Sequence, residues 1–458
     1  MTRKSVLIFS HEPVGPHMAG PAIRYVALAT VLAREFDVVL ATSKSSMPAP
    51  ISFEVREYDQ QPWEQVRAWC DEVDVVLLSG DILATFPRLA ELPLPIVIDG
   101  YDPHPAESLM RMAQHAFDLR LATYDYSVDL LTRQCLAGDF FLCASETQFT
   151  WWMGLLVVTG RINPYTFDED PTLRHLLAIV PYGLPMEDLP DIPSGFDIPG
   201  IPPCAPVLLW GGGLWDWLDP ITAIQALPYV LEQVPEARLL FPGTRHPDVN
   251  VAPMRMVELA RQVARDLGLL DTRIIFGDWV PRAQWPYYLQ RAAVGLSLHL
   301  DTIETRLAFR SRLMEYIWAG LPMVVSRGDE TSALVERYGL GYTVDFQAEK
   351  EVAEAIITLL KRPKQAWAAG FTRARADFAW EHVAQPLIEF CRAPRIAPDK
   401  LALGTALGNP RYRAELQLLR QQQDAALCEC ERLKDLVQRY ESGYFMRFMR
   451  WIKRFARR

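Results

Sequence analysis

Acidic and basic side chains are interleaved in one short segment of the chain, between His299 and Pro322. The charged residues considered there are Glu304, Arg306, Arg310, Arg312 and Glu315. An arginine fork suits a diphosphate, because the planar guanidinium donates paired hydrogen bonds and its charge is fixed. A carboxylate such as Glu304 or Glu315 suits the hydroxyl groups of a ribose or a sugar. The same pattern also fits a charged helix face in solvent, and the sequence leaves both interpretations open.

Two glycine-containing loops precede predicted helices, where free amide groups and the helix dipole favour an anion. The earlier loop, between residues 10 and 25, holds His17, Gly20, Pro21 and, in the first helical turn, Arg24. The later loop, WGGGLWDWLDP at 210–220, holds Gly212, Gly213, Trp215 and Trp217. The two tryptophans are suited to wall a ring or a sugar, or alternatively to pack between domains. The loops are neither a GK[ST] phosphate loop nor a GxGxxG fingerprint.

Two carboxylates and a histidine follow the apolar run at 95–100. Asp102 and His104, together with Asp99, have the chemistry to contact an acceptor hydroxyl or to act as a general base. The structural alternative is that Asp102 caps a helix that begins near Pro103. The two aspartates lack the spacing of a DxD motif, so no metal ion is implied.

Short apolar runs alternate with helical patterns twice along the chain. The first series of predicted strands starts at Val6, Phe36, Asp74, Pro95, Asp139 and Ala178, and the second at Pro206, Ala237, Arg273, Ala293, Leu321 and Gly341. Continuous apolar strands between helices indicate parallel sheets that are covered on both faces. We therefore predict an α/β protein with two doubly wound, Rossmann-like domains facing a cleft, plus a C-terminal helical extension. Ligands of such sheets bind at the carboxyl ends of the strands.

A proline-rich stretch separates the two series. Seven prolines fall within residues 184–206, which is typical of a semi-rigid linker. The N-terminal domain is predicted over 1–183 and the C-terminal domain over 207–391, and a return of the last helices to the N-terminal domain is left open. Residues 392–410 are predicted to be a second linker.

The C-terminal part of the chain reads as helix without strands. Apolar residues recur at 3,4 spacing through 411–440, over about three and a half heptads. This spacing predicts either a short coiled coil, which would pair two copies of the chain, or one amphipathic helix packed on the body. Residues 443–458 carry basic side chains beside an apolar stripe and no acid. They are predicted to form a helix on an anionic membrane surface or to dock on protein.

Composition excludes several classes of protein. The 458 residues carry a net charge of −9 and are 50% hydrophobic, so the chain can bury a core and lacks the basic character of a general nucleic-acid binder. Seven cysteines without a CxxC motif fit reduced thiols. The first apolar run is too short for a secretory signal, and no stretch reaches the length of a membrane span. We expect a cytoplasmic protein, peripheral at the inner face of the cell membrane.

The motifs together resemble those of GT-B fold glycosyltransferases of family 4. The residues that carry the resemblance are VPYG before the linker, FGDWVP at 276–281 and WAGLPMVV at 318–325. Glu315 stands where the second acid of the family's E-x7-E motif would lie. Leu307 occupies the position of the first acid, and Glu304 is the nearest upstream acid.

This resemblance implies a nucleotide-sugar donor in the C-terminal domain, an acceptor mainly in the N-terminal domain and a retaining transfer that needs no cofactor. The residues implied for the donor are Gly212, Gly213, Trp215, Arg245, Glu304, Arg310 and Glu315. Arg245 or Arg310 would replace the basic pair that the family carries after the first strand of this domain. The acceptor-side residues would be His17, Gly20, Pro21 and Arg24, and the catalytic candidates are Asp102 and His104.

Three functions remain open at this point. The first is transfer of a sugar to a cell-surface glycan or a lipid-linked acceptor. The second is a nucleotide-sugar 2-epimerase with the same fold, which the basic C-terminal segment disfavours because the substrate and product of such an isomerase are soluble. The third is a non-catalytic scaffold for glycan assembly, which the irregular donor motifs favour.

Overall fold

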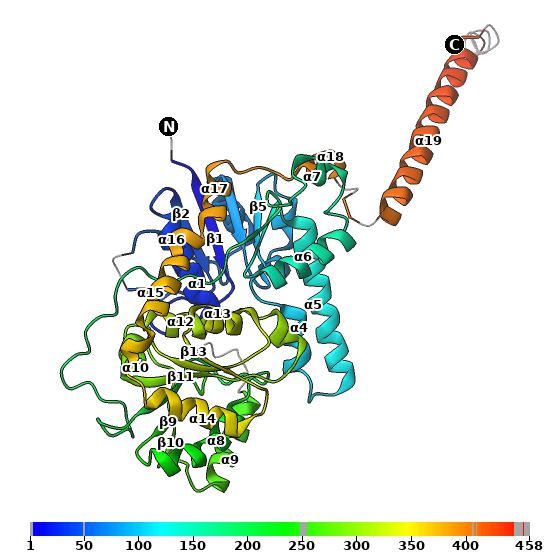
Figure 1. Ribbon diagram of the computed structural model, residues 1–458. Coiled ribbons are helices and arrows are strands. Elements are labelled where there is room, and N and C mark those ends of the chain that lie inside the picture. Colours follow the sequence, from blue (N-terminus) through cyan, green and yellow to red (C-terminus); the bar gives the residue numbers. More distant parts are fainter. Residues whose placement is uncertain are drawn as a thin grey trace.

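Two parallel β-sheets, one above the other in Figure 1, form the core of the molecule. The computed structural model describes residues 3–48, 51–247, 254–404, 407–408, 410–443 and 452. The similarity of the two sheets follows from the repeated alternation of apolar runs and helices in the sequence.

The N-terminal sheet has seven strands in the order β3-β2-β1-β4-β5-β6-β7, and every neighbouring pair is parallel. Its strands are β1 Ser5–Ser10, β2 Asp37–Thr42, β3 Glu54–Glu57, β4 Val75–Leu78, β5 Ile96–Asp99, β6 Phe140–Cys143 and β7 Leu177–Ile179. The strand order reverses between β1 and β4, which are neighbours in the sheet. This reversal opens a crevice at the carboxyl ends of the two strands.

Helices cover both faces of this sheet. They are α1 Gly20–Leu32, α2 Trp63–Asp71, α3 Ile82–Thr85, α4 His104–Arg111, α5 Phe117–Ala137, α6 Glu146–Val158 and α7 Pro164–Glu169, with a 3-10 helix at Pro87–Glu91. Successive side chains of a strand point to opposite faces. Accordingly, Ile8 packs in one core with Leu28 of α1, and Phe9 packs in another with Trp152 of α6.

The C-terminal sheet has six parallel strands in the order β10-β9-β8-β11-β12-β13, with its own reversal between β8 and β11. Its strands are β8 Val207–Trp210, β9 Arg238–Phe241, β10 Ile274–Phe276, β11 Ala292–Ser297, β12 Met323–Ser326 and β13 Gly341–Val344. The helices of this half are α8 Pro220–Gln233, α9 Arg255–Asp266, α10 Trp285–Arg291, α11 Ile303–Leu307, α12 Ser311–Trp318, α13 Glu330–Tyr338, α14 Glu349–Leu360 and α15 Ala368–Asp377, with a 3-10 helix at Lys364–Trp367.

The structure confirms the predicted fold class, and each predicted strand is present. One strand, β3, was not predicted, because its sequence EVRE contains a single apolar residue. It lies at the edge of the sheet, where one side of the strand has no neighbour and charged side chains are tolerated. A search for runs of apolar residues finds the buried central strands of a sheet. It misses an edge strand such as β3, because few of its side chains are apolar.

The end of the chain crosses back from the C-terminal half to the N-terminal sheet through α16 Trp380–Val383, α17 Gln385–Arg392 and α18 Pro398–Leu403 (Figure 1). The crossing is tied to the start of the proline-rich linker, where the Leu184 amide donates to the Phe378 carbonyl at 2.7 Å and the Trp380 amide donates to the Leu184 carbonyl at 3.0 Å. The linker itself is packed, since Ile198 and Ile201 are buried.

The prediction of a free linker over 392–410 is wrong for its middle part, because α18 is docked by a buried ion pair. Arg161 donates to both carboxylate oxygens of Asp399, at 2.7 and 3.2 Å, and both side chains are fully buried. Arg161 also donates to the carbonyls of Cys135 and Gly138. These partners lie 238 residues apart in the sequence. No local pattern in the sequence could therefore predict that they pair.

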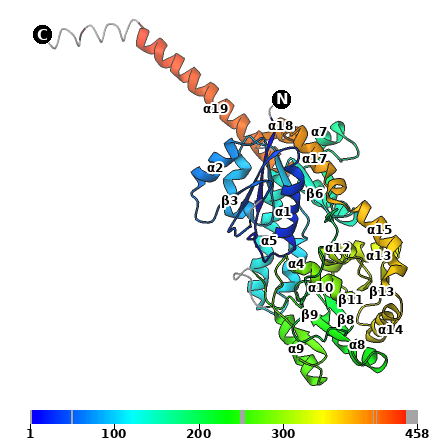
Figure 2. The same cartoon turned by 90° about the vertical axis from the view of Figure 1, so that its left-hand side faces the viewer.

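The last helix, α19 Pro410–Ser442, projects from the body in both views (Figures 1 and 2). Its described side chains are exposed, which contradicts the alternative in which this helix packs on the body. The predicted membrane-surface segment 443–458 lies outside the described residues, apart from Gly443 and Ile452. Within the part of the chain that the structure describes, every helix is too short or too polar to cross a bilayer.

The buried tether predicts a large cost for losing one of its partners. Replacing Asp399 by Ala leaves the Arg161 guanidinium buried without its carboxylate, which typically costs about 3–5 kcal/mol. We expect Asp399→Ala to lower the urea midpoint of the N-terminal domain strongly. Glu35→Ala is the matched control, because Glu35 pairs with Arg392 of the same C-terminal crossing on the exposed surface. Equal shifts from both substitutions would contradict the assigned role of the buried pair.

Candidate functional site

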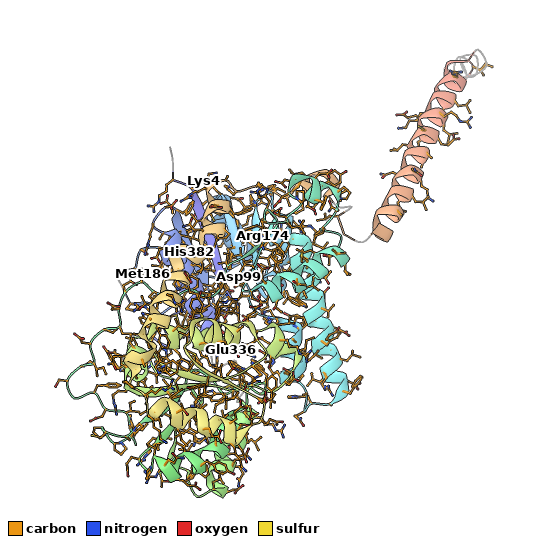
Figure 3. All side chains as sticks on the ribbon, viewed as in Figure 1. Lys4, Asp99, Arg174, Met186, Glu336 and His382 are labelled. Carbon is orange, nitrogen blue, oxygen red and sulfur yellow. The ribbon has the colours of Figure 1, made fainter. Side chains whose placement is uncertain are left out.

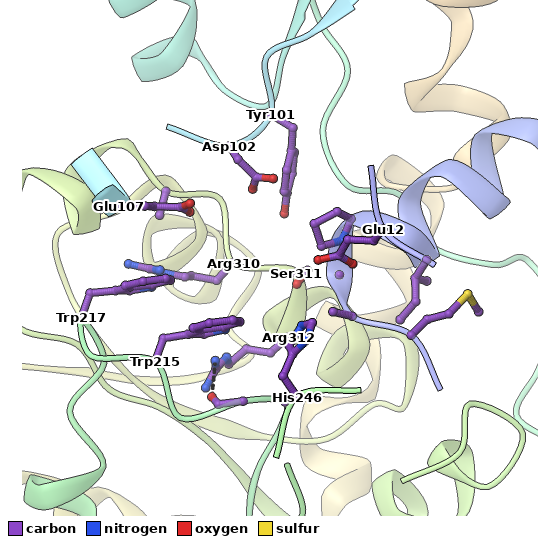
Figure 4. A pocket seen from close by; sticks show the side chains of 18 of the residues that line it. Glu12, Tyr101, Asp102, Glu107, Trp215, Trp217, His246, Arg310, Ser311 and Arg312 are labelled. Atoms are coloured by element: carbon purple, nitrogen blue, oxygen red, sulfur yellow. Dashed lines mark hydrogen bonds between the residues drawn. The ribbon is translucent and has the colours of Figure 1, made fainter. Parts of the chain in front are cut away.

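A cavity of about 550 Å³ lies between the two domains. Its walls come from the loops that follow β1, β5 and β8 and from the α11–α12 region, and so from the carboxyl ends of strands in both sheets. Figure 4 shows Tyr101 and Asp102 on one side of this cavity, and Trp215, Arg310 and Arg312 on the other. The two topological reversals therefore face each other across one space, as expected for open α/β sheets.

Most of the sequence-predicted site residues line this cavity. They are Gly20, Pro21, Asp102, His104, Gly212, Gly213, Trp215, Glu304, Arg310 and Glu315. The loop after β1 approaches the C-terminal domain closely, because a Cβ on Gly20 would lie 3.1 Å from the Ser311 hydroxyl oxygen. The structure thus brings together residues from four widely separated segments of the chain.

Three predicted residues do not line the cavity. Arg24 is fully buried and donates to Asp99 at 2.7 and 3.0 Å and to the Val180 and Pro181 carbonyls. All of these hydrogen bonds lie inside the N-terminal domain. The prediction that Arg24 contacts the acceptor substrate is therefore wrong. His17 and Arg245 are exposed, outside the lining. The neighbouring residues Met18 and His246 line the cavity instead.

Arg310, predicted to meet phosphate, is held by protein carboxylates. Its two terminal nitrogens donate to the two oxygens of Glu304, each at 2.7 Å, and its Nε lies 3.5 Å from Asp329. All three side chains are buried. Glu304 occupies both terminal nitrogens of Arg310, which are the donors that a diphosphate would need. The pair therefore supports the loop between α11 and α12.

Arg312 is the cation that the sequence analysis passed over in favour of Arg310, and it has no carboxylate partner among the described residues. One terminal nitrogen donates to the Gly213 carbonyl at 3.2 Å, and the other is buried without a hydrogen-bond partner. The guanidinium lies 5.3 Å from the centre of the Trp210 ring. Burial lowers the pKa of Arg312 to about 10, so the side chain keeps its charge at neutral pH.

The glycine loop beside Arg312 is fixed by Tyr316. The Gly211 amide donates to the Tyr316 hydroxyl oxygen at 2.6 Å, and that hydroxyl lies 3.0 and 2.9 Å from the carbonyls of Leu209 and Leu296. Tyr316 therefore joins the ends of β8 and β11 at the reversal. Gly212 has a φ of 76°, which favours glycine. The loop thus presents backbone directly to the space in front of α12.

Glu315 lines the cavity but is already engaged. Both of its oxygens accept from Arg282 at 2.9 Å, and one also accepts from the Trp285 indole at 3.0 Å. Arg282 connects the domains as well, since its amide donates to the Pro16 carbonyl at 2.7 Å. Any contact of Glu315 with a sugar would use the lone pairs that this network leaves.

An aromatic wall closes the C-terminal side of the cavity. Trp215 and Trp217 are stacked, with ring centres 5.2 Å apart and planes 2° from parallel. His246 follows at 5.5 Å from Trp215 and 5.4 Å from Trp279. The Trp279 indole donates across the domains to the Met18 carbonyl at 3.1 Å. Trp279 and His246 were missed in the sequence because nothing in their local pattern links them to Trp215.

Two acids, Asp102 and Glu107, line the N-terminal side of the cavity. Burial, with the charge of Asp99 as a second cause, raises the pKa of Asp102 to about 7. Burial and then the charges of Asp102 and Glu304 raise the pKa of Glu107 well above its usual range. Glu107 was also missed by the sequence, because it faces the cavity from inside α4. No side chain caps α4, so the capping alternative for Asp102 is wrong.

Two histidines lie next to these acids. Burial and the neighbouring His104 lower the pKa of His11 to about 3, so its ring is neutral at pH 7. The Ser79 hydroxyl donates to the Phe9 carbonyl and lies 3.2 Å from Nδ1 of His11, which places the ring proton on Nδ1 and leaves Nε2 as an acceptor. Burial also lowers the pKa of His104. Across residues 3–48, 51–247, 254–404 and the described part of α19, no His, Cys, Asp and Glu side chains gather in a group able to hold a metal ion.

The sequence and the fold were compared with those of known proteins. Residues 205–362 match the family model described as glycosyl transferases group 1, which covers about a third of the chain. No curated protein matches the chain in sequence. The group 1 resemblance is thus confirmed for the C-terminal sheet, whereas family 4 stays a prediction.

Solved structures establish the fold. The chain is similar over 85% of its length to WaaG, a glycosyltransferase involved in lipopolysaccharide biosynthesis, with 15% identity, a TM-score of 0.57 and 100% of that chain covered. It is similar over 85% to HepE from Anabaena in complex with UDP and glucose (15% identity, TM-score 0.60, all of that chain). It also matches sucrose-phosphate synthase from Thermosynechococcus elongatus over 85% (16% identity, TM-score 0.60, 98% of that chain). These likenesses show the GT-B fold.

The raised pKa of Asp102 predicts a pH-dependent effect on stability. The carboxyl ionises near pH 4 in the unfolded chain but near pH 7 in the folded protein, so its contribution to folding stability falls as pH rises through this window. Asp102→Asn removes that penalty. We expect the variant to melt at a higher temperature than wild type at pH 8, with a smaller difference at pH 5. A difference that is the same at both pH values would contradict the shifted pKa.

Proposed function

We propose that the protein is a glycosyltransferase that moves a sugar from a nucleoside diphosphate sugar to a glycan or lipid-linked acceptor, with retention at the anomeric carbon. The observation that carries the proposal is Arg312, a partly buried cation with one unpaired nitrogen that faces the glycine loop inside the interdomain cavity. A buried charge without a partner is costly, and a diphosphate would supply the missing anion. The group 1 match of residues 205–362 supports the same assignment.

The donor would lie along the C-terminal wall. The diphosphate would meet Arg312, the amides of Gly212 and Gly213, and the start of α12, which is the positive end of that helix. The stacked Trp215 and Trp217 would bound a ring of the donor. HepE, which is similar in fold and is solved in complex with UDP-glucose, supports a nucleotide-sugar ligand.

The acceptor would enter from the N-terminal wall, past Gly20 and Pro21. In the transfer, the acceptor oxygen bonds to the anomeric carbon, and the bond from that carbon to the phosphate oxygen breaks. The acceptor proton passes to the departing phosphate or to Asp102, whose pKa near 7 suits proton transfer at neutral pH. His104 and the neutral His11 would orient the hydroxyl. The proposal assigns no resident metal or cofactor, and the nucleotide sugar is a substrate.

A donor assay tests the proposed activity against its alternatives. Purified protein is incubated with nucleoside diphosphate sugars, and nucleoside diphosphate and sugar products are measured. Release of nucleoside diphosphate supports a transferase, because such enzymes hydrolyse donor slowly when acceptor is absent. Interconversion of the sugar without release would identify an epimerase. Binding without either reaction would point to a scaffold for glycan assembly.

The arginines make the donor site testable residue by residue. Arg312→Ala should weaken binding of UDP or another nucleoside diphosphate by about 1.5–3 kcal/mol, because a charge-assisted hydrogen bond is lost. Titration calorimetry measures this loss. Arg306→Ala is the control, since Arg306 is exposed and pairs only with Asp301. Small and equal effects of the two substitutions would remove the assigned phosphate contact.

The basic C-terminal segment gives a further prediction about location. We propose that residues 443–458 hold the protein on the anionic inner face of the cell membrane, where basic residues contribute about 1 kcal/mol each. Full-length protein should float with liposomes that contain anionic lipid, and high salt should release part of it. A version that ends at Ser442 should stay unbound. If truncation leaves flotation unchanged, the segment is not the anchor.

A further inference from the structure

The helix α19 leaves an apolar stripe in water. It runs for 33 residues, a length of about 50 Å at 1.5 Å per residue. Leu419, Leu433 and Val437 on it are 56%, 48% and 57% exposed. Figure 3 shows this helix, with its described side chains drawn as sticks, standing clear of the rest of the molecule. Helices in proteins gain most of their stability by packing such a stripe against another element, so the stripe calls for a partner.

The spacing of the stripe specifies what kind of partner fits. Its described members are Leu419, Gln423, Ala426, Cys430, Leu433 and Val437, which alternate steps of four and three residues. This is the a and d pattern of a heptad, with Gln423, Cys430 and Val437 at a and the others at d. A 3.5-residue repeat matches a second helix that supercoils around the first. Val437 at a, with Leu419 and Leu433 at d, follows the preference of two parallel strands, whereas Gln423, Cys430 and Ala426 make the middle of the seam weaker.

Charge at the flanks of the stripe selects a second copy of the same chain. Glu429, which also pairs with the exposed Arg432 of the same helix, occupies a g position, and Lys434 occupies the e position five residues later. In a parallel pair in register, Glu429 of one copy faces Lys434 of the other, which is attractive. In an antiparallel pair g faces g and e faces e, so the attraction between Glu429 and Lys434 would be lost. Gln423, a polar residue at an a position, pairs best with itself and so opposes sliding of the register.

We propose that α19 pairs two copies of this protein in a parallel, in-register coiled coil. The pairing places Cys430 of both copies in the same a layer, where the two Cα atoms come within the reach of a disulfide. Cys428 occupies an f position on the outer side of each helix. The parallel arrangement also puts the two bodies at one end of the coil and the two basic segments that follow it in sequence at the other. A surface that attracts those segments would therefore be engaged twice, which raises avidity.

Light scattering on the full-length chain tests the pairing. We expect twice the mass of one chain at micromolar concentration. Leu419→Asp places a charge in the seam and should give the single-chain mass. Leu418→Asp is the matched control, because Leu418 is 55% exposed, directly adjacent and at the outward c position. A single-chain mass for wild type, or equal behaviour of the two variants, would overturn the proposal.

Cross-linking tests the orientation and register in the same full-length chain. In a background with the exposed Cys204 replaced by Ser, mild oxidation with diamide should link two chains through Cys430. Cys428→Ser should leave this product unchanged, and Cys430→Ser should reduce it at least tenfold. Equal loss from both substitutions would overturn the parallel, in-register arrangement. Circular dichroism on each variant checks that the fold is retained, and neither assay depends on the proposed glycosyl transfer.

Discussion

The cost of burying an unpaired charge organises this molecule. Ionised groups leave water only if an opposite charge and hydrogen bonds replace the lost hydration. Four arginines around the core and the cleft meet this condition with a carboxylate, and they are Arg24, Arg161, Arg282 and Arg310. Each of these joins segments or supports a loop. Arg312 does not meet the condition within the described chain, and this exception marks the part of the cavity that is suited to an anionic ligand.

The same constraint explains how the two domains face each other. Contacts across the cleft are mostly hydrogen bonds to backbone carbonyls, such as Tyr101 to Phe309 at 2.6 Å and Gln148 to Leu307 at 2.8 Å. They depend on the path of the α11–α12 loop, which the Arg310–Glu304 pair fixes from within. The Arg310–Glu304 pair therefore shapes the cavity without contacting a ligand. It does so because it holds in place the carbonyl groups to which the N-terminal domain binds.

The helix α19, beyond the two domains, differs from the body in where its apolar side chains lie. The two-domain body is closed by apolar cores and buried ion pairs, whereas α19 carries its apolar stripe outside. The stripe is narrow and interrupted by Gln423 and Ala426, so it is suited to a partner of the same length rather than to a broad protein surface. The proposed transfer site and the proposed pairing helix thus lie on separate parts of the chain.

The sequence by itself determined the α/β class, the two series of parallel strands and the loops that reach the cleft, because these depend on local patterns of apolar residues and glycines. It also pointed to the segment from Glu304 to Glu315, which the structure places along the cavity. It assigned the phosphate contact to Arg310 rather than to Arg312, since both look alike two positions apart, and the structure contradicts that choice. Only the tertiary structure decided between them, because the choice depends on which guanidinium meets Glu304 and Asp329.

The same limit applied to the other corrected residues. Arg24 resembles a ligand-binding residue in its loop, but Asp99 lies 75 residues further on and takes up its charge. Glu107 gave no local signal, and Trp279 stood out only as part of the FGDWVP motif, because their places in the cavity arise from the approach of the two domains. Two residues that are far apart in the chain leave no periodic pattern in the sequence when they pair. The sequence therefore shows which charged side chains the loops carry. Only the tertiary structure shows which of these side chains are already paired with an opposite charge inside the protein.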